Sequence, residues 1–302
     1  MFMLDLSVII LTFNEEIHIK RCIENTIPIA KDIFIVDSFS TDKTVEIAES
    51  LGAEVYKNKW PNSFGKQTNW ALDNLPIQTK WVLRLDADEY MVPELIREIE
   101  EKLSEVSEEV AGIIFKRRHI FLGRWIKRGT YPVKLLRLFR YKKARCEELW
   151  TGDEHIQLTE GSAVEFQYDF VDHNLLNLAL WTQKHNGYSI KEAIELLDIE
   201  FNFTGKASEN TLQGQAAKKR NRKLSYVSKP LFFRSFAYFI YRYILKLGFT
   251  EGKEGFLWHF LQGWWYRTLV DARIFEIKKA CGNDREKIVD YIRENYGIRV
   301  MS

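Results

Sequence analysis

Apolar residues up to about residue 115 alternate between two spacings along the chain. Short runs of consecutive apolar residues are typical of strands buried on both faces, and residues three or four positions apart are typical of amphipathic helices. This alternation predicts an α/β fold, in which a mostly parallel sheet is covered by helices on both faces. The predicted strands are 7–11, 32–37, 53–57 and 80–85, and the predicted helices are 14–25, 40–52, 63–75 and 93–103.

Three of these helices begin with residues that suit a helix N-terminus. We expect Ser40 or Thr41 to cap the second helix and Ser63 to cap the third, because their hydroxyl oxygens accept hydrogen bonds from free backbone N–H groups. Pro93 suits the first turn of the fourth helix, where its missing N–H is not needed.

From about residue 111 the pattern changes to short strands between Gly and Pro residues, and then to helix. We therefore expect one domain over residues 1–174, which divides at about residue 110, and a helical C-terminal region over residues 175–302. The later strands are predicted at 111–118, 133–140, 154–158 and 162–166, and helix is predicted from 174 onward.

The composition fits a globular protein with a sizeable core, since 46% of the 302 residues are hydrophobic. A net charge of only +2 argues against nucleic acid as a partner. Cys22, Cys146 and Cys281 lie far apart, which indicates neither a disulfide framework nor a cysteine zinc site. The N-terminus resembles no secretion signal, and no apolar run is long enough to span a membrane, so we expect a cytoplasmic protein.

Polar residues follow three of the four predicted parallel strands, and these are the candidate ligand-binding positions. Thr12, Phe13, Asn14 and Glu15 follow the first strand, Asp37 ends the second, and the segment Asp86, Ala87, Asp88 and Glu89 follows the fourth. Ligands of open parallel sheets bind outside the carboxyl ends of the strands, so these residues are expected to form one site.

The sequence has neither a GxGxxG nor a GxxxxGK[ST] glycine loop, which argues against a dinucleotide-binding or P-loop domain. A divalent cation held by carboxylates can neutralise phosphates instead, and Mg²⁺ and Mn²⁺ prefer oxygen ligands. Asp86 and Asp88, two positions apart, would point the same way in a strand. The alternative is that they form a capping turn before Pro93. Glu89 is expected to face solvent or to cap that helix.

The order of "SVIILTFNEE", "IFIVDSFSTDKTVEIAESLGAEV", "FGKQTNWAL" and "WVLRLDADEY" resembles the inverting family-2 glycosyltransferases with a GT-A fold. The likeness covers about residues 5–175, and "FLGRWIKRGTYPVKLLRLFR" extends it toward short bacterial enzymes that add a sugar to the lipopolysaccharide inner core. It implies a nucleotide-sugar half over about 1–110 and an acceptor half over about 111–174.

The resemblance also implies roles for individual residues. Asp88 would ligate Mn²⁺ or Mg²⁺ directly, Asp86 would contact the ribose or a metal-bound water, and His173 would complete the metal shell. Arg128, beside Gly129, is a candidate phosphate partner in a flexible loop. The residues expected at the nucleotide sugar are Thr12, Phe13, Asn14, Glu15, Asp37, Lys66, Gln67, Asn69, Arg84, Asp86, Ala87 and Arg128.

Each of these roles has a structural alternative. Lys66 and Gln67 could be solvated helix positions, and Glu15 could only stabilise the first turn of a helix. His173 could be structural, and Arg137 and Arg140 could be ordinary exposed strand positions.

An inverting transfer needs a base that takes the proton from the attacking acceptor hydroxyl. The segment "GDEHI" resembles the corresponding element of the short core-sugar enzymes, which implies Glu154 as this base. Asp153 is the rival, because family-2 enzymes more broadly carry an acidic pair that ends in Asp. A surface turn without a catalytic role is the remaining alternative.

The C-terminal region combines basic and aromatic residues at helical spacing. Arg234, Tyr238, Arg242 and Lys246 would form a basic face on one helix, and "KKRNRK" at 218–223 adds further positive charge. Such a helix could lie on an anionic membrane surface, with Trp258, Trp264 and Trp265 at the interface. The alternative is that these aromatic residues form a core or a contact between subunits.

The sequence therefore predicts a metal-dependent glycosyltransferase that moves a hexose from a nucleotide sugar to a bacterial surface saccharide or glycolipid, and we expect the donor to be a UDP-sugar. Two other classes stay open at this point. A nucleotidyltransferase also combines an α/β sheet with metal-binding acids, and a non-catalytic scaffold could bind nucleotide sugars without turnover.

Overall fold

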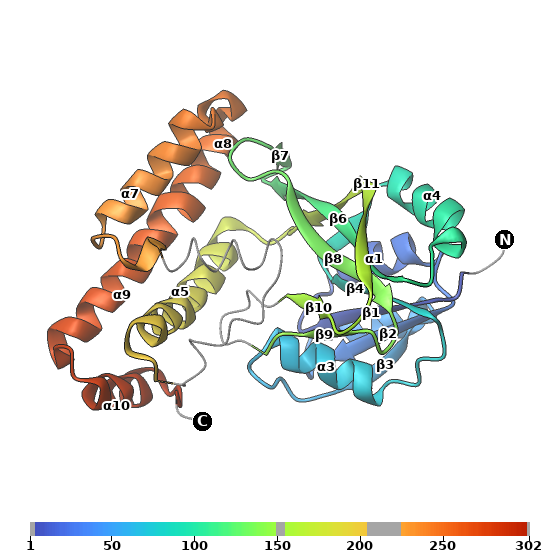
Figure 1. The fold of residues 1–302 in the computed structure, drawn as a ribbon, viewed down its shortest axis with the longest axis horizontal. Helices are drawn as coiled ribbons and strands as arrows, with labels where there is room; N and C mark the ends of the chain where they lie inside the picture. The colour runs from blue at the N-terminus through green and yellow to red at the C-terminus, as the bar shows by residue number, and fades with distance from the viewer. Residues whose placement is uncertain (1–3, 149–154, 204–224, 301–302) are drawn as a thin grey trace. The chain divides into compact units, whose positions relative to one another are not determined.

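The structure is a computed structural model that describes residues 4–148, 155–203 and 225–300. The chain forms two compact units, Met1–Leu175 and Leu176–Ser302, and each has a hydrophobic core of its own (Figure 1).

Four parallel strands form one half of the main sheet of unit Met1–Leu175, in the order β3-β2-β1-β4. All seven residues of β1 are buried, as a strand at the centre of a covered sheet requires. The parallel arrangement predicted for these strands is confirmed. The strands are β1 (Leu6–Thr12), β2 (Asp32–Asp37), β3 (Glu54–Lys57) and β4 (Trp81–Asp86).

The second half of the sheet continues from β4 in the order β8-β6-β11-β5, with β7 beside β6. Here only β6 and β11 pair in parallel, so the described sheet as a whole is mixed. A separate two-stranded ribbon pairs β9 with β10. These strands are β5 (Glu89–Met91), β6 (Val110–Phe121), β7 (Arg124–Ile126), β8 (Val133–Arg140), β9 (Ala144–Cys146), β10 (Ile156–Leu158) and β11 (Ser162–His173).

Helices cover both faces of the sheet, as the apolar spacing predicts. Leu6, Val8 and Ile10 of β1 pack in the cluster that contains α1 and α4, while Ile9 and Leu11 pack in the cluster with α3. This alternation is the period of two that a strand imposes on its side chains. The helices are α1 (Ile19–Thr26), α2 (Thr44–Ser50), α3 (Phe64–Asn74), α4 (Pro93–Lys102) and the short η1 (Leu103–Glu105).

The predicted start of the second helix is wrong. Helix α2 begins at Thr44, and neither Ser40 nor Thr41 caps it. Ser40 instead donates its hydroxyl to Asp37, and the backbone N–H of Thr41 donates to the side chain of Asn14. The prediction for Ser63 is confirmed, because its hydroxyl accepts from the backbone N–H of Lys66 at 3.0 Å.

Unit Leu176–Ser302 is helical in its described residues. Side chains of Asn177 and Asp284 cap the N-termini of α5 and α10. No helix among the described residues is long and apolar enough to cross a membrane. The helices are α5 (Leu178–Phe201), α7 (Phe233–Ile240), η3 (Tyr241–Leu245), η4 (Gly248–Glu251), α8 (Gly252–Trp258), η5 (His259–Trp265), α9 (Tyr266–Cys281) and α10 (Arg285–Tyr296).

The basic face predicted on the first of the aromatic-rich helices is wrong. Arg234 and Arg242 are only 4% and 2% exposed. Arg234 forms an ion pair with buried Asp271 at 2.6 Å, and Arg242 donates to Gln262. A buried charge is costly unless it is paired, and these partners make the inward position of both arginines possible. Trp258 is also buried, and residues 218–223 lie outside the described residues.

Candidate functional site

The ends of β1 and β2 are joined by a buried hydrogen bond. The hydroxyl of Thr12 donates to Asp37 at 2.9 Å, and both residues are buried. Asp37 also accepts from the backbone N–H and the hydroxyl of Ser40, at 2.8 and 2.5 Å. These three hydrogen bonds therefore fix the orientation of the Asp37 carboxylate without any ligand. Its predicted contact with a nucleotide stays a prediction.

Asn14 shapes the loop that follows β1. Its φ of 55° lies in the left-handed region, which Asn tolerates better than most residues. Its backbone N–H donates to the hydroxyl of Ser40 at 2.8 Å, and its side-chain oxygen accepts from the N–H of Thr41 at 2.8 Å. The side chain of the neighbouring Phe13 is exposed. The loop therefore presents Phe13 on a rigid frame beside the end of β2.

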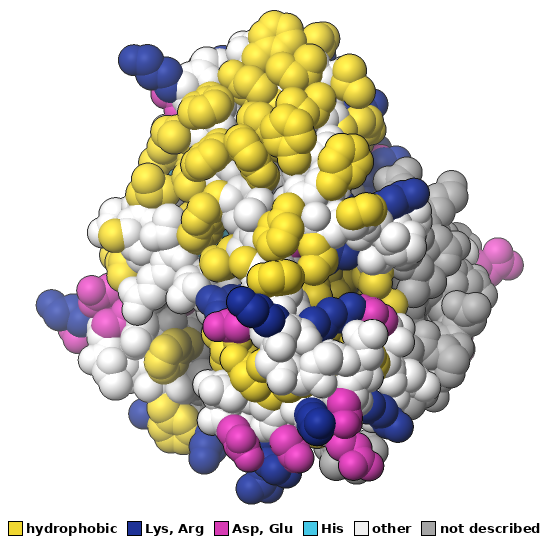
Figure 2. All heavy atoms as spheres, turned by 90° about the vertical axis from the view of Figure 1, so that its left-hand side faces the viewer, with side chains coloured by type: hydrophobic (Ala, Val, Ile, Leu, Met, Phe, Trp, Pro, Cys, Tyr) yellow, Lys and Arg dark blue, Asp and Glu magenta, His cyan; other side chains and the backbone are white. Residues whose placement is uncertain are grey.

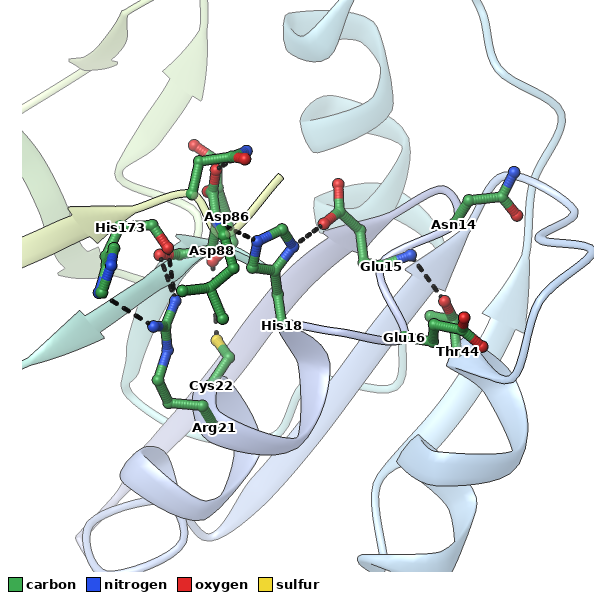
Figure 3. A network of polar contacts seen from close by, with 12 residues as sticks. Asn14, Glu15, Glu16, His18, Arg21, Cys22, Thr44, Asp86, Asp88 and His173 are labelled. Carbon is green, nitrogen blue, oxygen red and sulfur yellow. Dashed lines mark hydrogen bonds and ion pairs between the residues drawn. The ribbon is translucent and has the colours of Figure 1, made fainter. Parts of the chain in front are cut away.

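Glu15 is held by His18, a residue that the sequence analysis did not identify (Figure 3). The two side chains lie 2.6 Å apart, and His18 is completely buried. The Nε2 atom of His18 accepts the backbone N–H of Leu175 at 2.8 Å, so its Nδ1 atom carries the proton that is donated to Glu15. Glu15 therefore does more than favour the first turn of a helix.

The acid cluster after β4 is neutralised largely by two arginines. Arg84 binds both oxygens of Asp86, at 2.7 and 2.9 Å, and Arg137 lies 3.3 Å from the same carboxylate. Burial would raise the pKa of Asp86, but the two guanidinium groups hold it below its usual value. Asp86 is therefore ionised and already paired within the protein.

Glu89 is buried, so its predicted position in solvent or at a helix cap is wrong. It is 2.5 Å from Arg137, and it accepts the backbone N–H of Asp86 at 2.9 Å. Burial raises the pKa of Glu89 to about 7, against the opposing charge of Arg137. Arg137 and Arg140 are also buried, which excludes the exposed positions considered for them.

Asp88 and His173 are joined through Arg21 (Figure 3). The guanidinium of Arg21 donates to the carbonyl oxygens of Asp88 and His173, at 3.2 and 2.7 Å, and its Nη1 lies 3.2 Å from Nδ1 of His173. Burial and the charge of Arg21 lower the pKa of His173, so its imidazole is neutral. Asn174 donates to the Asp88 carboxylate at 2.9 Å.

Arg21 was also absent from the sequence predictions. A weak signal existed, because His18 and Arg21 are three residues apart and so share one face of a helix. The sequence does not show that this helix face contacts residues 173–175. That contact becomes visible only in the structure, where the end of β11 lies beside α1.

Helix α3 meets the site through Gln67, while Lys66 is exposed. Gln67 is completely buried, which excludes a solvated position; it donates to Ser38 at 3.2 Å and accepts from Asn58 at 2.8 Å. Asn69 binds the backbone of Cys146 through both its oxygen and its nitrogen, at 2.9 Å each. The predicted contacts of all three with a nucleotide remain untested.

The remaining predicted residues fall into two groups. Ala87 is buried, and Arg128 is exposed in the turn that follows β7. The two candidate bases, Asp153 and Glu154, lie outside the described residues. The strands on either side of them are joined, since the N–H of Glu147 donates to the carbonyl of His155 at 3.0 Å.

The described residues contain no ready-made cluster of metal ligands. Within residues 4–148, 155–203 and 225–300, no three His, Cys, Asp or Glu side chains gather closely enough to hold a metal ion. Asp86 is already bound by arginines. The Asp88 carboxylate accepts from the Asn174 amide, and carboxylate oxygens are the kind of ligand that Mg²⁺ and Mn²⁺ prefer. One carboxylate together with phosphate and water oxygens satisfies such an ion.

Comparison with known proteins gives a consistent family. The model described as "Glycosyl transferase family 2" matches residues 7–166, which is just over half of the chain. An uncharacterized glycosyltransferase from Rickettsia bellii is 28% identical over 255 residues, covering 83% of this chain and 80% of the relative. The lipopolysaccharide core biosynthesis glycosyltransferase LpsC from Rhizobium meliloti is 30% identical over 153 residues, 48% of this chain and 54% of LpsC.

Solved structures give more distant matches. A glucosyl-3-phosphoglycerate synthase from Mycobacterium tuberculosis is 22% identical with a TM-score of 0.32; the match covers 38% of this chain and 44% of the synthase, less than half its length. A second mycobacterial protein is 16% identical with a TM-score of 0.44, over 64% of this chain and 73% of that protein.

Proposed function

This chain belongs to glycosyl transferase family 2, and from that premise we propose a metal-dependent, inverting transfer of a hexose from a UDP-sugar to a saccharide acceptor. Family membership and the glycosyltransferase relatives make the chain a glycosyltransferase. The donor, the metal and the acceptor are the parts that we propose.

One observation carries the choice of site. The strands β2, β1 and β4 are neighbours in the sheet, and their carboxyl ends bring the Asn14 loop, Asp37 and the Asp86 segment to one edge. Thr12 is in register with Asp37, and Leu11 with Asp86. This edge is where α/β proteins bind nucleotides. The donor's nucleoside would lie along the Asn14 loop and Asp37, and its diphosphate beside Asp88.

The charges at this edge support a cation-assisted donor site. Arg84 forms an ion pair with Asp86, and Arg137 forms one with Glu89. These arginines are therefore poorly placed to neutralise a diphosphate. We propose that Asp88 is the carboxylate ligand of Mn²⁺ or Mg²⁺, with His173 beside it. When bound, the cation would stabilise the negative charge of the departing diphosphate.

The acceptor hydroxyl needs a base on the opposite side of the sugar. We propose Glu154 for this role, with Asp153 as the alternative. Deprotonation lets the hydroxyl oxygen attack the anomeric carbon as the bond to the diphosphate breaks, which inverts the anomeric configuration. Strands β9 and β10 pair with each other on either side of residues 149–154, and this pairing supports the proposal because it fixes the chain before and after the segment.

The proposed acceptor is a saccharide of lipopolysaccharide or another bacterial surface polysaccharide, built at the cytoplasmic face of the membrane. Its support is the similarity to LpsC, whose name places that relative in lipopolysaccharide core biosynthesis.

The test is incubation of the protein with nucleotide sugars and Mn²⁺, followed by analysis of the released nucleotide. We expect release of UDP, which Asp88→Asn abolishes while Asp5→Asn, at an exposed position, leaves it unchanged. Release of pyrophosphate would instead indicate nucleotidyl transfer. Binding without any release, at every donor tried, would overturn the proposed activity.

A further inference from the structure

Helices α7 and α8 and the segments between them carry large apolar side chains on the outside of unit Leu176–Ser302. Leu245 is 68% exposed and Phe233 is 66% exposed, far more than folding alone favours. Figure 2 shows hydrophobic side chains gathered over one part of this unit's surface. We call the following set the apolar face: Phe233, Phe236, Ile244, Leu245, Phe249 and Phe256.

The apolar face is continuous. A chain of ring contacts runs from Phe236 through Trp264 and Phe260 to Phe256, with neighbouring centroids 5.2 to 5.9 Å apart. Tyr243 then joins Phe256 to Phe249, at 5.7 and 6.4 Å. Single exposed apolar residues need no explanation, but a connected patch marks a site of interaction.

The polarity of α7 and η3 is the reverse of that of an ordinary surface helix. Arg234 and Arg242 are turned into the unit, where Asp271 and Gln262 bind them, while Phe233, Phe236 and Leu245 face outward. A helix in water normally exposes its charges and buries its aromatic residues. The arrangement seen here suits a surface whose working environment is apolar.

The turn between η3 and η4 extends this surface. Leu247 occupies it with a φ of 60°, in the left-handed region that a branched side chain adopts at a cost, and its side chain is exposed. A glycine would relieve that cost. The turn instead presents Leu245, Leu247 and Phe249 at alternate positions, a compact apolar tip.

Charge decides between the possible occupants. From Phe233 to Trp258 the exposed charged side chains are Lys246 and Lys253, whereas Glu251 is buried and Glu254 half-buried. A second copy of the chain would bring the same lysines together around the interface, with no exposed acid of this segment to pair with them. Anionic lipid headgroups complement them directly.

We propose that the apolar face docks on an anionic phospholipid bilayer, with Leu245, Leu247 and Phe249 entering the boundary between headgroups and acyl chains. Aromatic and aliphatic side chains beside lysines are the pattern of helices that lie in this interface. Such docking extends the proposed function, because it brings the enzyme to a lipid-linked acceptor.

The test is flotation of the full chain with vesicles of phosphatidylethanolamine and phosphatidylglycerol, compared with vesicles of phosphatidylcholine. We expect the protein to float with the anionic vesicles, less so at high salt. Leu245→Ser/Phe249→Ser should weaken binding at least about tenfold, because each side chain contributes through its buried apolar area. Lys246→Glu/Lys253→Glu should remove the preference for anionic lipid.

The matched control is Ile27→Ser/Val164→Ser, which replaces two exposed apolar side chains of unit Met1–Leu175 and should leave flotation unchanged. Thermal melting checks that every variant is folded. Protein that stays in the lipid-free fraction, or a Leu245→Ser/Phe249→Ser variant that floats like the wild type, overturns the proposal. So does a wild-type dimer that this variant converts to monomer without any change in lipid binding. Flotation needs neither donor nor turnover, so failure of the proposed transferase activity would not affect it.

Discussion

Glu89 illustrates how the partner of a buried acid can lie far away in the sequence. Three acids within four residues indicated a metal site or a helix cap, but nothing local pointed to Arg137, which lies 48 residues later. Strand β8 brings that arginine to the acids by pairing with β4. The sequence correctly located the cluster, and only the pairing of the strands reveals which of its members are structural.

At pH 8, where Glu89 is ionised beside Arg137, replacing Arg137 with Met should destabilise unit Met1–Leu175 by about 3–5 kcal/mol, because Glu89 must then stay charged without its cation or take up a proton. The double variant Arg137→Met/Glu89→Gln should recover much of this loss. Chemical denaturation monitored by tryptophan fluorescence measures both. A single variant as stable as the double variant would contradict the assigned ion pair.

The raised pKa of Glu89 also predicts a pH dependence. The folded protein holds this proton up to pH about 7, whereas the unfolded chain releases it near 4.5, so the contribution of Glu89 to stability falls as pH rises between these values. Glu89→Gln should remove that slope. Asp86 is ionised in both the folded and the unfolded state over this range, and the wild type and the variant contain the same histidines. The difference between their unfolding free energies therefore reports on Glu89. Parallel stability curves from pH 4.5 to 7.5 would contradict the shift.

Glu154→Gln should abolish transfer while sparing donor binding, because the amide keeps the shape of the side chain but cannot take a proton. Product formation and binding of UDP, measured by calorimetry, separate the two effects. Asp153→Asn is the matched control and should retain turnover. If the outcomes are exchanged, Asp153 is the base.

At the scale of elements, α3 packs closely against the segment that leads to the candidate base. A Cβ on Gly65 would lie 1.8 Å from the carbonyl oxygen of Glu147, so only glycine allows the present approach. Asn69 fixes the same segment through the backbone of Cys146 and the side chain of Glu148. The N-terminal half of α3 therefore positions residues 146–148, which precede the segment that holds the candidate base.

Gly65→Ala should cost about 1–3 kcal/mol, as overpacking does, and should reduce transfer because Glu147 must move. Gly187→Ala is the matched control within α5, where an added Cβ meets no atom within 4 Å. That change should stabilise the helix by about 0.5–1 kcal/mol. Melting curves and initial rates test both, and an active, fully stable Gly65→Ala protein would refute the close contact.

The elements that the sequence predicts best are those whose side chains interact with residues nearby in the sequence. The buried strand at 7–11 and the cap at Ser63 depend on neighbours within a few residues, and both were correct. Ser40 and Thr41 resembled a cap, but Asp37 and Asn14 use their polar groups instead. Arg234 and Arg242 had the spacing of an exposed stripe, and long-range partners turned them inward.

At the scale of the molecule, ligand binding should be visible as a gain in stability. UDP with Mn²⁺ should raise the melting temperature of unit Met1–Leu175, because a ligand at 100 times its dissociation constant adds about 2.7 kcal/mol. EDTA should reverse most of the rise if Asp88 holds the cation as proposed. Mn²⁺ alone and UDP alone are the controls, and an equal rise with UDP in EDTA would contradict metal-dependent binding.

The bonds from residues 173–175 back to the first third of the chain have a consequence for synthesis. His173 binds Asp88 and Arg21 through its backbone, and Leu175 completes the bond to His18 that orients Glu15. A nascent chain that has emerged only as far as β8 lacks all of these bonds. Contacts between residues so far apart also slow folding. The residues of the proposed donor site are thus encoded early in the chain, yet their bonds are complete only when β11 and Leu175 have left the ribosome.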